Sequence, residues 1–376
     1  MILTQCAVCA TDLGLSLGKK CGRCSTRYCG PECQKKHWEE GGHDRLCKKI
    51  KKAGGAEQYN ANQKYAEAVV VAAEACAEDT KGQTCYICTQ ALHWKTKEGL
   101  VRGCSCRGTA GFAHLSCLAE QAKILVEDAE ERNLDDGKFE RWYACSLCEQ
   151  KYHGVVKCAL GWACWKAYLG RPEADWARGS AMTALGTGLA AAARHEDALS
   201  VQEAALSMRR RHGAPEESML SAQNNLAISY DALGRFERAL QMKREVYSGR
   251  LKLNGEEHEM TFRAANNYAD TLLRLRRFEE AKSVLRKAAP VARRIVGEEH
   301  LLTLKMRKNY ARALCLNAGA TLDDLREAVT TLEDVERVAR RVLGGTHPLA
   351  MNIEASLRAA RATLSARETP PTSNQR

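Results

Sequence analysis

The C-terminal half of the chain repeats its pattern of apolar and polar positions every 42 residues. The motif Asn-Tyr-Ala, with Leu for Tyr in its first copy, marks this register at 225–227, 267–269 and 309–311. Within each unit, apolar and alanine positions recur at helical spacing on two segments that a Gly/Arg turn divides. One helix pair cannot bury its apolar face alone, so stacked pairs with a continuous core are predicted over 179–367.

Two segments of the N-terminal half are also predicted to be helical. The segment 51–83 is rich in Lys, Ala and Glu and is expected to be a helical linker. The segment 155–178 is expected to be a connecting helix; its apolar stretch carries Lys157 and Lys166, which argues against a membrane span. The predicted fold class is therefore mainly α.

Cysteine usage changes this picture, because most of the 18 cysteines lie between Cys6 and Cys148. Such clustering indicates either disulfides or metal sites. The first residues show no basic segment followed by an apolar one, as a secretory signal would, so an intracellular protein with reduced thiols is expected. Paired cysteines separated by two residues then indicate metal.

The first cysteine cluster contains eight ligand-type residues: Cys6, Cys9, Cys21, Cys24, Cys29, Cys33, His43 and Cys47. Eight ligands fill two tetrahedral zinc sites and leave no open position for a catalytic water. A segment this short buries too little apolar surface to fold alone, so bound metal is expected to stabilise it. By chemistry alone, His37 is a rival ligand.

This cluster resembles a MYND finger, most clearly in Arg27-Tyr28-Cys29-Gly30 and in Cys33-Gln34-Lys35-Lys36-His37-Trp38. The resemblance assigns residues 1–50 to the finger and excludes His37 as a ligand. It implies interleaved zinc pairing, with Cys6, Cys9, Cys29 and Cys33 on one ion and Cys21, Cys24, His43 and Cys47 on the other. It also implies a groove for a proline-containing peptide, lined by Gln34 and Trp38. Alternatively, Trp38 only covers the zinc sites.

The second cluster again supplies eight ligands for two ions: Cys85, Cys88, Cys104, Cys106, His114, Cys117, Cys145 and Cys148. The histidine is fifth in order, as in RING-CH fingers and, more loosely, in PHD fingers. The stretch from Cys104 to Cys117 resembles RING-CH, which places the finger at 84–154. That resemblance implies that Cys85, Cys88, His114 and Cys117 bind one ion, and that Cys104, Cys106, Cys145 and Cys148 bind the other. The two fingers together would hold four Zn²⁺ ions.

RING-CH proteins are typically ubiquitin ligases that dock a ubiquitin-conjugating enzyme beside the zinc loops. Ile87 matches the usual apolar docking residue. The tryptophan common after the sixth ligand is absent, however, and Ser146-Leu147 occupies a place where proline is usual. Trp142 and Tyr143 either replace the missing docking surface or pack against the zinc loops. An active ligase and an inactive structural finger both remain open.

The repeats resemble tetratricopeptide repeats, specifically the 42-residue form of kinesin light chains. The resemblance implies a concave surface that grips peptides, and the mixed-to-basic character of the residues mapped to it indicates an extended, acidic peptide. Register mapping points these residues toward the groove: Asn224, Arg263, Asn266, Asp270, Arg274, Lys305, Lys308 and Arg312. Asn225 and Asn267 lie beside it. Alternatively, the asparagines only bond neighbouring helices. The segment 351–367 is expected to cap the array before a disordered tail at 368–376.

The net charge of +11 raises nucleic-acid binding as a further class. The basic runs at 48–52 and 209–211 contain no stacking aromatics, so solvated helix faces are favoured over nucleic-acid or membrane contact. The sequence thus predicts an intracellular zinc-binding adaptor that recruits protein partners, cytoplasmic or nuclear. The alternative is a ubiquitin ligase that uses its repeats to select substrates.

Overall fold

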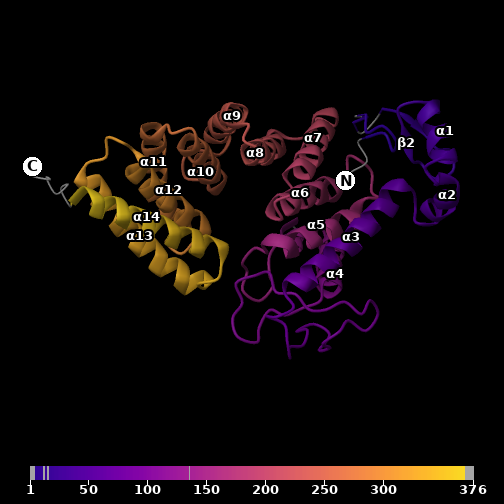
Figure 1. Cartoon of the computed structure of the whole chain (residues 1–376), viewed down its shortest axis with the longest axis horizontal. Coiled ribbons are helices and arrows are strands. Elements are labelled where there is room, and N and C mark those ends of the chain that lie inside the picture. The colour runs from indigo at the N-terminus through magenta and orange to yellow at the C-terminus, as the bar shows by residue number, and fades with distance from the viewer. Residues whose placement is uncertain (1–4, 12, 15–16, 135, 369–376) are drawn as a thin grey trace, which may run out of the picture. The chain divides into compact units, whose positions relative to one another are not determined.

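The computed structural model describes residues 5–11, 13–14, 17–134 and 136–368, and it is mainly helical, as the sequence predicts. The chain forms two compact units, Met1–Ser229 and Tyr230–Arg376, and the boundary falls inside helix α8 (Glu216–Ala232). Each unit is described by itself (Figure 1). Apart from Glu368, the predicted tail at 368–376 lies outside the described residues.

The first finger contains a two-stranded antiparallel sheet and two short helices. Strand β1 (Lys19–Lys20) pairs with β2 (Arg27–Tyr28), and helices α1 (Pro31–Glu39) and α2 (His43–Lys52) follow. Proline suits the first turn of α1, where no backbone donor is needed. The few buried apolar side chains lie among the cysteines: Leu13, Tyr28, Ile50 and Ala56. This core is small, which makes the finger dependent on metal.

The second finger is built mostly from loops around its cysteines. Its regular parts are helix α4 (Leu115–Glu131), the 3-10 helix η1 (Asp136–Trp142) and two isolated bridges, Val101 with Ala113 and Ala144 with Lys151. Its buried core combines ligand-type cysteines with apolar side chains, including Leu100, Val101, Phe112, Leu115 and Tyr152.

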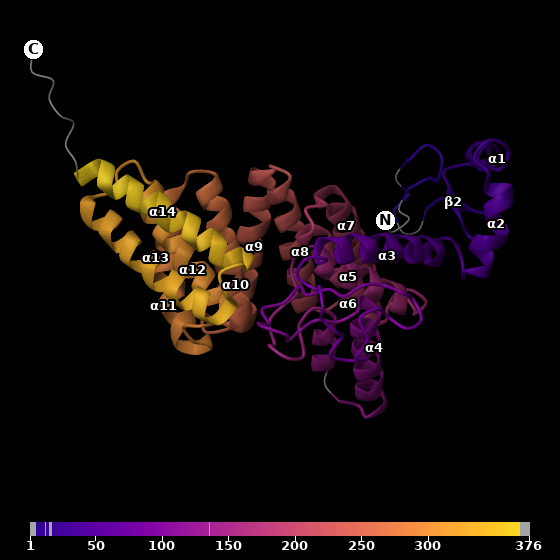
Figure 2. The ribbon, with the colours of Figure 1, turned by 60° about the horizontal axis from the view of Figure 1, so that its bottom comes forward.

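The first unit also contains α3 (Ala56–Ala75), α5 (Gly154–Tyr168), α6 (Trp176–Ala191), α7 (His195–Arg211) and most of α8. Helix α5 is buried almost all round, and it packs against α3 and α6 (Figures 1 and 2). Glycines allow α5 and α6 to approach closely: a Cβ at Gly161 would lie 2.9 Å from the Ala184 carbonyl oxygen, and one at Gly188 would lie 2.8 Å from that of Lys157.

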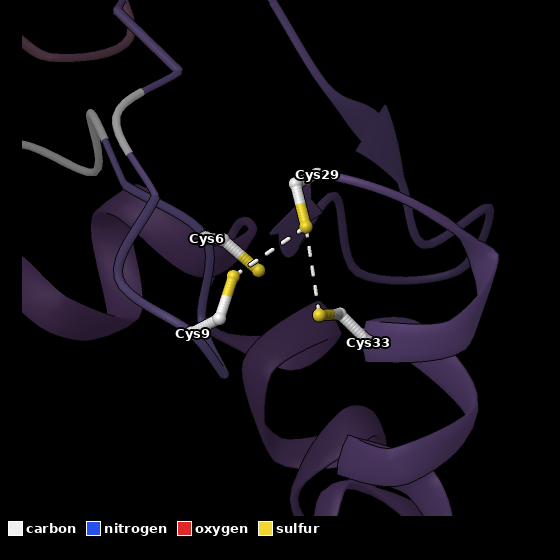
Figure 3. A group of neighbouring side chains, drawn as sticks. All are labelled: Cys6, Cys9, Cys29 and Cys33. Carbon is white, nitrogen blue, oxygen red and sulfur yellow. Dashed lines mark hydrogen bonds between the residues drawn. The ribbon is translucent and has the colours of Figure 1, made fainter.

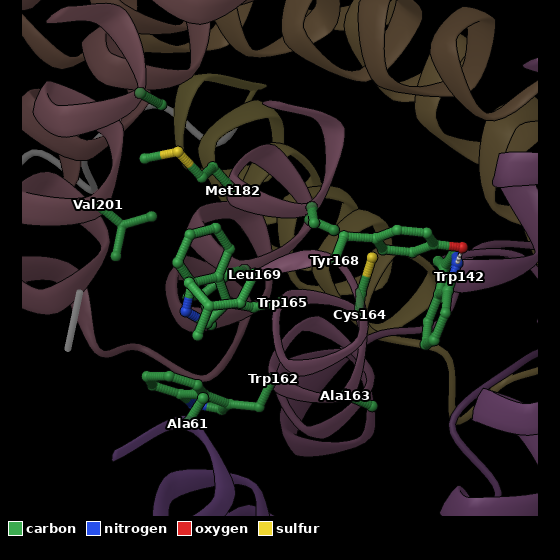
Figure 4. Close-up of a cluster of buried hydrophobic side chains, with 14 of the residues drawn as sticks. Ala61, Trp142, Trp162, Ala163, Cys164, Trp165, Tyr168, Leu169, Met182 and Val201 are labelled. Atoms are coloured by element: carbon green, nitrogen blue, oxygen red, sulfur yellow. Dashed lines mark hydrogen bonds between the residues drawn. The ribbon is translucent and has the colours of Figure 1, made fainter. Parts of the chain in front are cut away.

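The cluster around α5 is the largest core of this unit. Trp162, Cys164 and Trp165 from α5 pack with Met182 of α6 and Val201 of α7 (Figure 4). The apolar character of α5 is therefore explained by burial inside the protein. Among the described residues, no helix combines the length and the apolar character that crossing a bilayer requires.

The second unit continues the helix pairs with α9 (Phe236–Asn254), α10 (Glu259–Arg274), α11 (Phe278–Val296), α12 (Leu301–Leu316), α13 (Leu322–Leu343) and α14 (Pro348–Glu368). Each of these helices packs against the next from α9 to α14, as Figure 2 shows. Helix α14 extends the predicted capping segment by three residues at its start.

The Gly-Glu-Glu-His motif forms the turns between repeats. Gly255 and Gly297 end α9 and α11 with φ of 80° and 92°, a backbone region that favours glycine. Their carbonyls each accept a hydrogen bond from the hydroxyl of the threonine six residues on, Thr261 at 2.7 Å and Thr303 at 2.8 Å. The same turn is thus built twice from the same residues.

Candidate metal centres and interaction surfaces

The structure brings the sixteen predicted ligands together in four groups. The groups are Cys6, Cys9, Cys29 and Cys33 (Figure 3); Cys21, Cys24, His43 and Cys47; Cys85, Cys88, His114 and Cys117; and Cys104, Cys106, Cys145 and Cys148. In each group the four ligand atoms lie within 4.8 Å of one another. These groups are the interleaved sets that the two resemblances imply.

The distances between ligand atoms fit tetrahedral zinc. With a Zn–S bond of about 2.3 Å, two sulfurs on one tetrahedral ion are separated by about 3.8 Å. The Sγ–Sγ distance is 3.5 Å between Cys9 and Cys29, 3.9 Å between Cys21 and Cys47, and 3.8 Å between Cys106 and Cys145. Four ligands in each group, all of them sulfur or imidazole nitrogen, make four structural zinc sites.

Thiol electrostatics also favour a cation in these groups. In the last group, contact with Cys104 lowers the pKa of Cys145, whereas contact with Cys145 raises the pKa of Cys104. Two thiolates this close repel each other, so one ionises at the expense of the other. A bound divalent cation removes that conflict, because it stabilises every coordinating thiolate at once.

The imidazole ligands present different nitrogens to their groups. His114 directs Nδ1 toward the sulfurs of Cys88 and Cys117, at 3.3 and 3.7 Å, while its Nε2 lies 3.3 Å from the Ala91 carbonyl oxygen. That carbonyl holds the ring in position and fixes Nδ1 as the coordinating atom. His43 instead directs Nε2 toward Cys24 Sγ, at 3.4 Å.

The four Cys-x-x-Cys pairs share one backbone turn. In each, the N–H of the first cysteine donates to the carbonyl five residues on, at 2.8 to 3.0 Å, as in the bond from Cys85 to Gln90. The residue after the second cysteine has a left-handed backbone in every case, at Ala10, Ser25, Thr89 and Glu149. None of these is glycine, so the turns rely on the surrounding bonds and the metal to hold a costly conformation.

A fifth turn of this form contains no cysteine. His93 N–H donates to the Glu98 carbonyl at 3.0 Å, and Lys97 adopts the left-handed backbone. Thr96 takes the place of the second cysteine, with its hydroxyl 2.8 Å from His93 Nδ1. This imidazole–hydroxyl bond closes the fifth turn, whereas the other four turns rely on metal. Trp94, within the fifth turn, is 68% exposed. Sequence reasoning missed this turn because neither of its key residues is cysteine.

His37 lies outside all four groups. Its Nδ1 is 3.0 Å from the Tyr28 hydroxyl, and its ring lies 4.8 Å from the His43 ring. Gln34 is half-buried and lies one turn before Trp38 on the same face of α1. Trp38 contacts the His43 ring edge-on, so it covers a zinc site, yet the side chain remains 43% exposed to solvent.

In the second finger, a hydrogen bond joins two zinc-binding turns. The hydroxyls of Tyr86 and Ser146, the residues that precede Ile87 and Leu147, lie 3.1 Å apart. Ile87 is half-buried and Leu147 is exposed. Trp142 is 1% exposed and donates to the Tyr168 hydroxyl at 3.3 Å, so it belongs to the core and offers no docking surface.

The predicted groove residues of the second unit lie on α10 and α12, which pack against each other. Arg263, Asn266 and Asn267 are on α10, and Lys305, Lys308 and Arg312 are on α12. The predicted residues Asn224 and Asn225 are half-buried on α8, in the first unit.

The asparagine ladder links neighbouring helices. Asn309 Nδ2 donates to Asn266 Oδ1 at 3.1 Å, and both side chains are buried. Arg312 Nη1 lies 3.4 Å from Asp270 Oδ1, whereas Arg263 pairs with Glu259 on its own helix. Asn266 therefore has the alternative role considered for the asparagines, in which the side chain bonds to a neighbouring helix.

Two lysines of α12 leave positive charge in this groove. Lys308 Nζ donates to the neutral Asn352 side chain at 2.9 Å, and within the described residues no carboxylate forms a direct ion pair with Lys305 or Lys308. The Asp270 carboxylate nevertheless acts on both lysines and partly opposes the lowering of their pKa values. Burial first, and Arg312 next, lower the pKa of Lys308 to about 8. Burial first, and Arg263 next, also lower the pKa of Lys305, although its side chain is open to solvent.

The four cysteines outside the groups differ in burial. Cys158 and Cys164 are buried, whereas Cys76 and Cys315 are half-buried. Burial raises the pKa of all four thiols, so they are largely protonated at neutral pH.

Family models match all three predicted modules. Residues 6–47 match the MYND finger, residues 85–148 match the RING-variant domain, and residues 178–252 and 260–319 match the tetratricopeptide repeat. The sequence resemblances are thereby confirmed, and all three modules are of protein-interaction type. No protein of curated function is similar enough to count as a match.

Several solved structures are similar to the repeat-containing part of the chain. The TPR-like repeats of a protein described as a kinesin light chain from Podosopora anserina are 20% identical, with a TM-score of 0.42 over 53% of this chain and 90% of that one. BtubC (BKLC) from P. vanneervenii is 17% identical, with a TM-score of 0.33 over 70% of this chain and 95% of that one. Similarities this low say nothing about function.

Proposed function

We propose that this chain, with its MYND finger, RING-variant domain and tetratricopeptide repeats, is an intracellular adaptor whose repeats bind an extended acidic peptide. The observation that carries the proposal is the pair of lysines on α12, Lys305 and Lys308, neither of which has a carboxylate partner among the described residues. The carboxylate of Asp270 acts on both lysines, but it is already paired with Arg274 and Arg312, so positive charge remains in excess around them. Such an excess attracts an anionic ligand, and partial desolvation strengthens each new ion pair.

The zinc fingers extend this role to further partners. Four structural sites with filled coordination shells leave no position for a metal-bound water, so zinc would hold the fingers in shape. In the first finger, Gln34 and Trp38 share one face of α1 and would contact a proline-containing peptide. The proposed modules are 1–50 and 84–154 for the fingers and 179–367 for the repeats, joined by helices at 51–83 and 155–178.

A charge change in the groove is predicted to weaken acidic-peptide binding. Lys305→Glu places a carboxylate beside Arg263 on an accessible surface, and we expect the affinity for a fluorescent polyglutamate peptide to fall about tenfold. The control Lys287→Glu changes the same charge on α11, outside the groove, and should bind like the wild type. Equal weakening by both variants in an anisotropy titration would show that the groove has no special role.

The same binding is predicted to depend on pH. Lys308 is charged below its pKa of about 8 and loses its charge above it, while the peptide carboxylates stay ionised throughout. Affinity should therefore be highest near pH 7 and should fall by pH 9. In Lys308→Met this decline should become smaller, and what remains is expected from Lys305, whose pKa is also lowered. A decline as large as that of the wild type would assign the titration to another group.

Ubiquitin ligation is the second candidate function, and one contact favours it. The bond between Tyr86 and Ser146 joins the two turns that carry Ile87 and Leu147, and a ubiquitin-conjugating enzyme would dock against these apolar side chains. A ligase of this type supplies no nucleophile of its own; it accelerates transfer by holding the charged conjugate near a substrate lysine.

A ubiquitin-transfer assay with a panel of conjugating enzymes tests this candidate. If the finger is active, Ile87→Ala should reduce chain formation about tenfold or more, because an apolar anchor at a docking surface is lost. The matched control Ile124→Ala removes an exposed isoleucine from α4 and should leave the rate unchanged. If no conjugating enzyme of the panel yields ubiquitin chains, the ligase function is rejected and the adaptor function is the one that stands.

A further inference from the structure

The Asn-Tyr-Ala motif places a tyrosine at the same position of two consecutive repeats. Tyr268 on α10 and Tyr310 on α12 are 42 residues apart, and both are half-buried. The first copy of the motif carries the buried Leu226 instead. The groove described above does not involve these tyrosines. Each of them instead lines a separate hollow in the second unit.

The first hollow, of about 540 Å³, lies where α9, α10 and the start of α11 meet. Tyr268 and the buried Leu240 contribute its apolar surface. Its charged lining consists of Arg238, Arg244, Arg277 and Glu237.

The second hollow, of about 450 Å³, lies between α11, α12 and α13. Its apolar surface comes from Leu285, Ala289, Pro290 and Tyr310, and its charged lining consists of Arg286, Arg293, Arg307 and Glu327. Pro290 lies inside α11 and has no N–H, so the Arg286 carbonyl lacks its usual helical donor. An acceptor at the wall of the hollow is thereby left for another donor.

The two hollows have matching charge. Each is lined by three arginines and one glutamate. One arginine of each hollow is already neutralised by carboxylates outside the lining: Arg277 pairs with Glu280, and Arg307 pairs with Glu298 and Asp334. Arg244 and Arg286 are equivalent in the repeat register. Within the described chain no carboxylate pairs with Arg244, Arg286 or Arg293, and all three are exposed. Many neighbouring surface arginines do have partners, such as Arg294 with Glu257 and Arg341 with Glu299.

We propose that these two hollows form a second interaction surface, which binds a partner segment with acidic side chains flanking apolar ones. An apolar side chain would enter each hollow against its tyrosine, and carboxylates would pair with the arginines at the rim. Arginine suits this role because its planar fork binds a carboxylate through two hydrogen bonds. One segment that reaches both hollows would gain avidity, because the second contact becomes intramolecular.

Charge reversal in the full-length chain tests this surface. The probe is a fluorescent peptide of alternating glutamate and leucine, and the variants are Arg244→Glu and the double variant Arg286→Glu/Arg293→Glu. Each should weaken binding about tenfold, and their combination should weaken it further. The control Arg358→Glu reverses an exposed arginine of α14 that lines neither hollow and should change nothing. The helical circular dichroism of all variants should match the wild type.

A charge-swapped probe separates specific contact from lost folding. A peptide of alternating lysine and leucine should bind the combined variant better than it binds the wild type. The proposal is overturned if the wild type shows no saturable binding of the acidic peptide, or if only Lys305→Glu in the groove weakens it. The latter result would leave the proposed function of the groove intact.

Discussion

Replacing Cys104 by serine is expected to remove one zinc ion and unfold the second finger. Cys104 is buried, and its sulfur belongs to the group with Cys106, Cys145 and Cys148. A structural zinc site contributes roughly 10–16 kcal/mol of folding free energy, which exceeds the stability of a typical small domain. Amide hydrogen exchange should therefore become fast across 84–154, including the bridge between Val101 and Ala113.

The matched control is Cys76→Ser. Cys76 ends α3 in the same unit, is half-buried and belongs to none of the four groups. The Cys76→Ser variant should keep all its zinc and its protection from amide hydrogen exchange. If Cys104→Ser also retained protection over 84–154, the loops of the finger would be held by packing alone, and the role assigned to the metal would be wrong.

Replacing Lys243 by leucine is expected to destabilise the second unit by about 3 kcal/mol. Lys243 is buried, with 2% of its surface exposed. Its Nζ donates hydrogen bonds to Asp231 Oδ2 at 3.1 Å and to Thr271 Oγ1 at 2.7 Å. Thr271 in turn donates to Asp231 Oδ1 at 3.1 Å. Without the lysine, Arg274, whose side chain is 46% exposed, is the one cation left within ion-pair distance of the buried Asp231 among the residues that the structure describes.

The next repeat provides the rescue for this variant. Forty-two residues on, the same three positions are the buried Leu273, Leu285 and Ala313. The triple change Asp231→Leu/Lys243→Leu/Thr271→Ala should therefore recover most of the lost stability, because an apolar group of fitting size replaces the whole polar set. Hydrogen exchange of the α10 amides measures the stability of both variants. A triple variant less stable than Lys243→Leu would contradict this interpretation.

Much of the architecture could be predicted because metal ligands and repeats follow strict spacing. The 42-residue period gives the helix pairs, and the turns at Gly255 and Gly297 recur with it. The assignment of the sixteen ligands to four ions rests on family resemblance, because the eight cysteines and histidines of each finger can be divided between two ions in several ways. The proposed domain boundaries stay predictions, because α3 and α5 pack together and no break in composition marks the edge of a compact unit.

Other features were beyond sequence reasoning for physical reasons. The left-handed residues of the zinc-binding turns are alanine, serine, threonine and glutamate, none of which is a residue type that favours a positive φ. The role of Trp142 stayed open because an aromatic residue beside zinc ligands fits a core as well as a surface. Asn266 lies on the predicted face of α10 but is buried against Asn309, and helical periodicity cannot show how closely a neighbouring helix covers that face.

Counting bound zinc by native mass spectrometry of the fully reduced, zinc-supplied chain decides whether sixteen side chains share four ions. Four zinc ions per chain are expected, with one fewer in Cys104→Ser and all four retained in Cys76→Ser. A wild-type chain that binds three ions or fewer would contradict the assignment of at least one group, and with it the view that metal shapes both fingers.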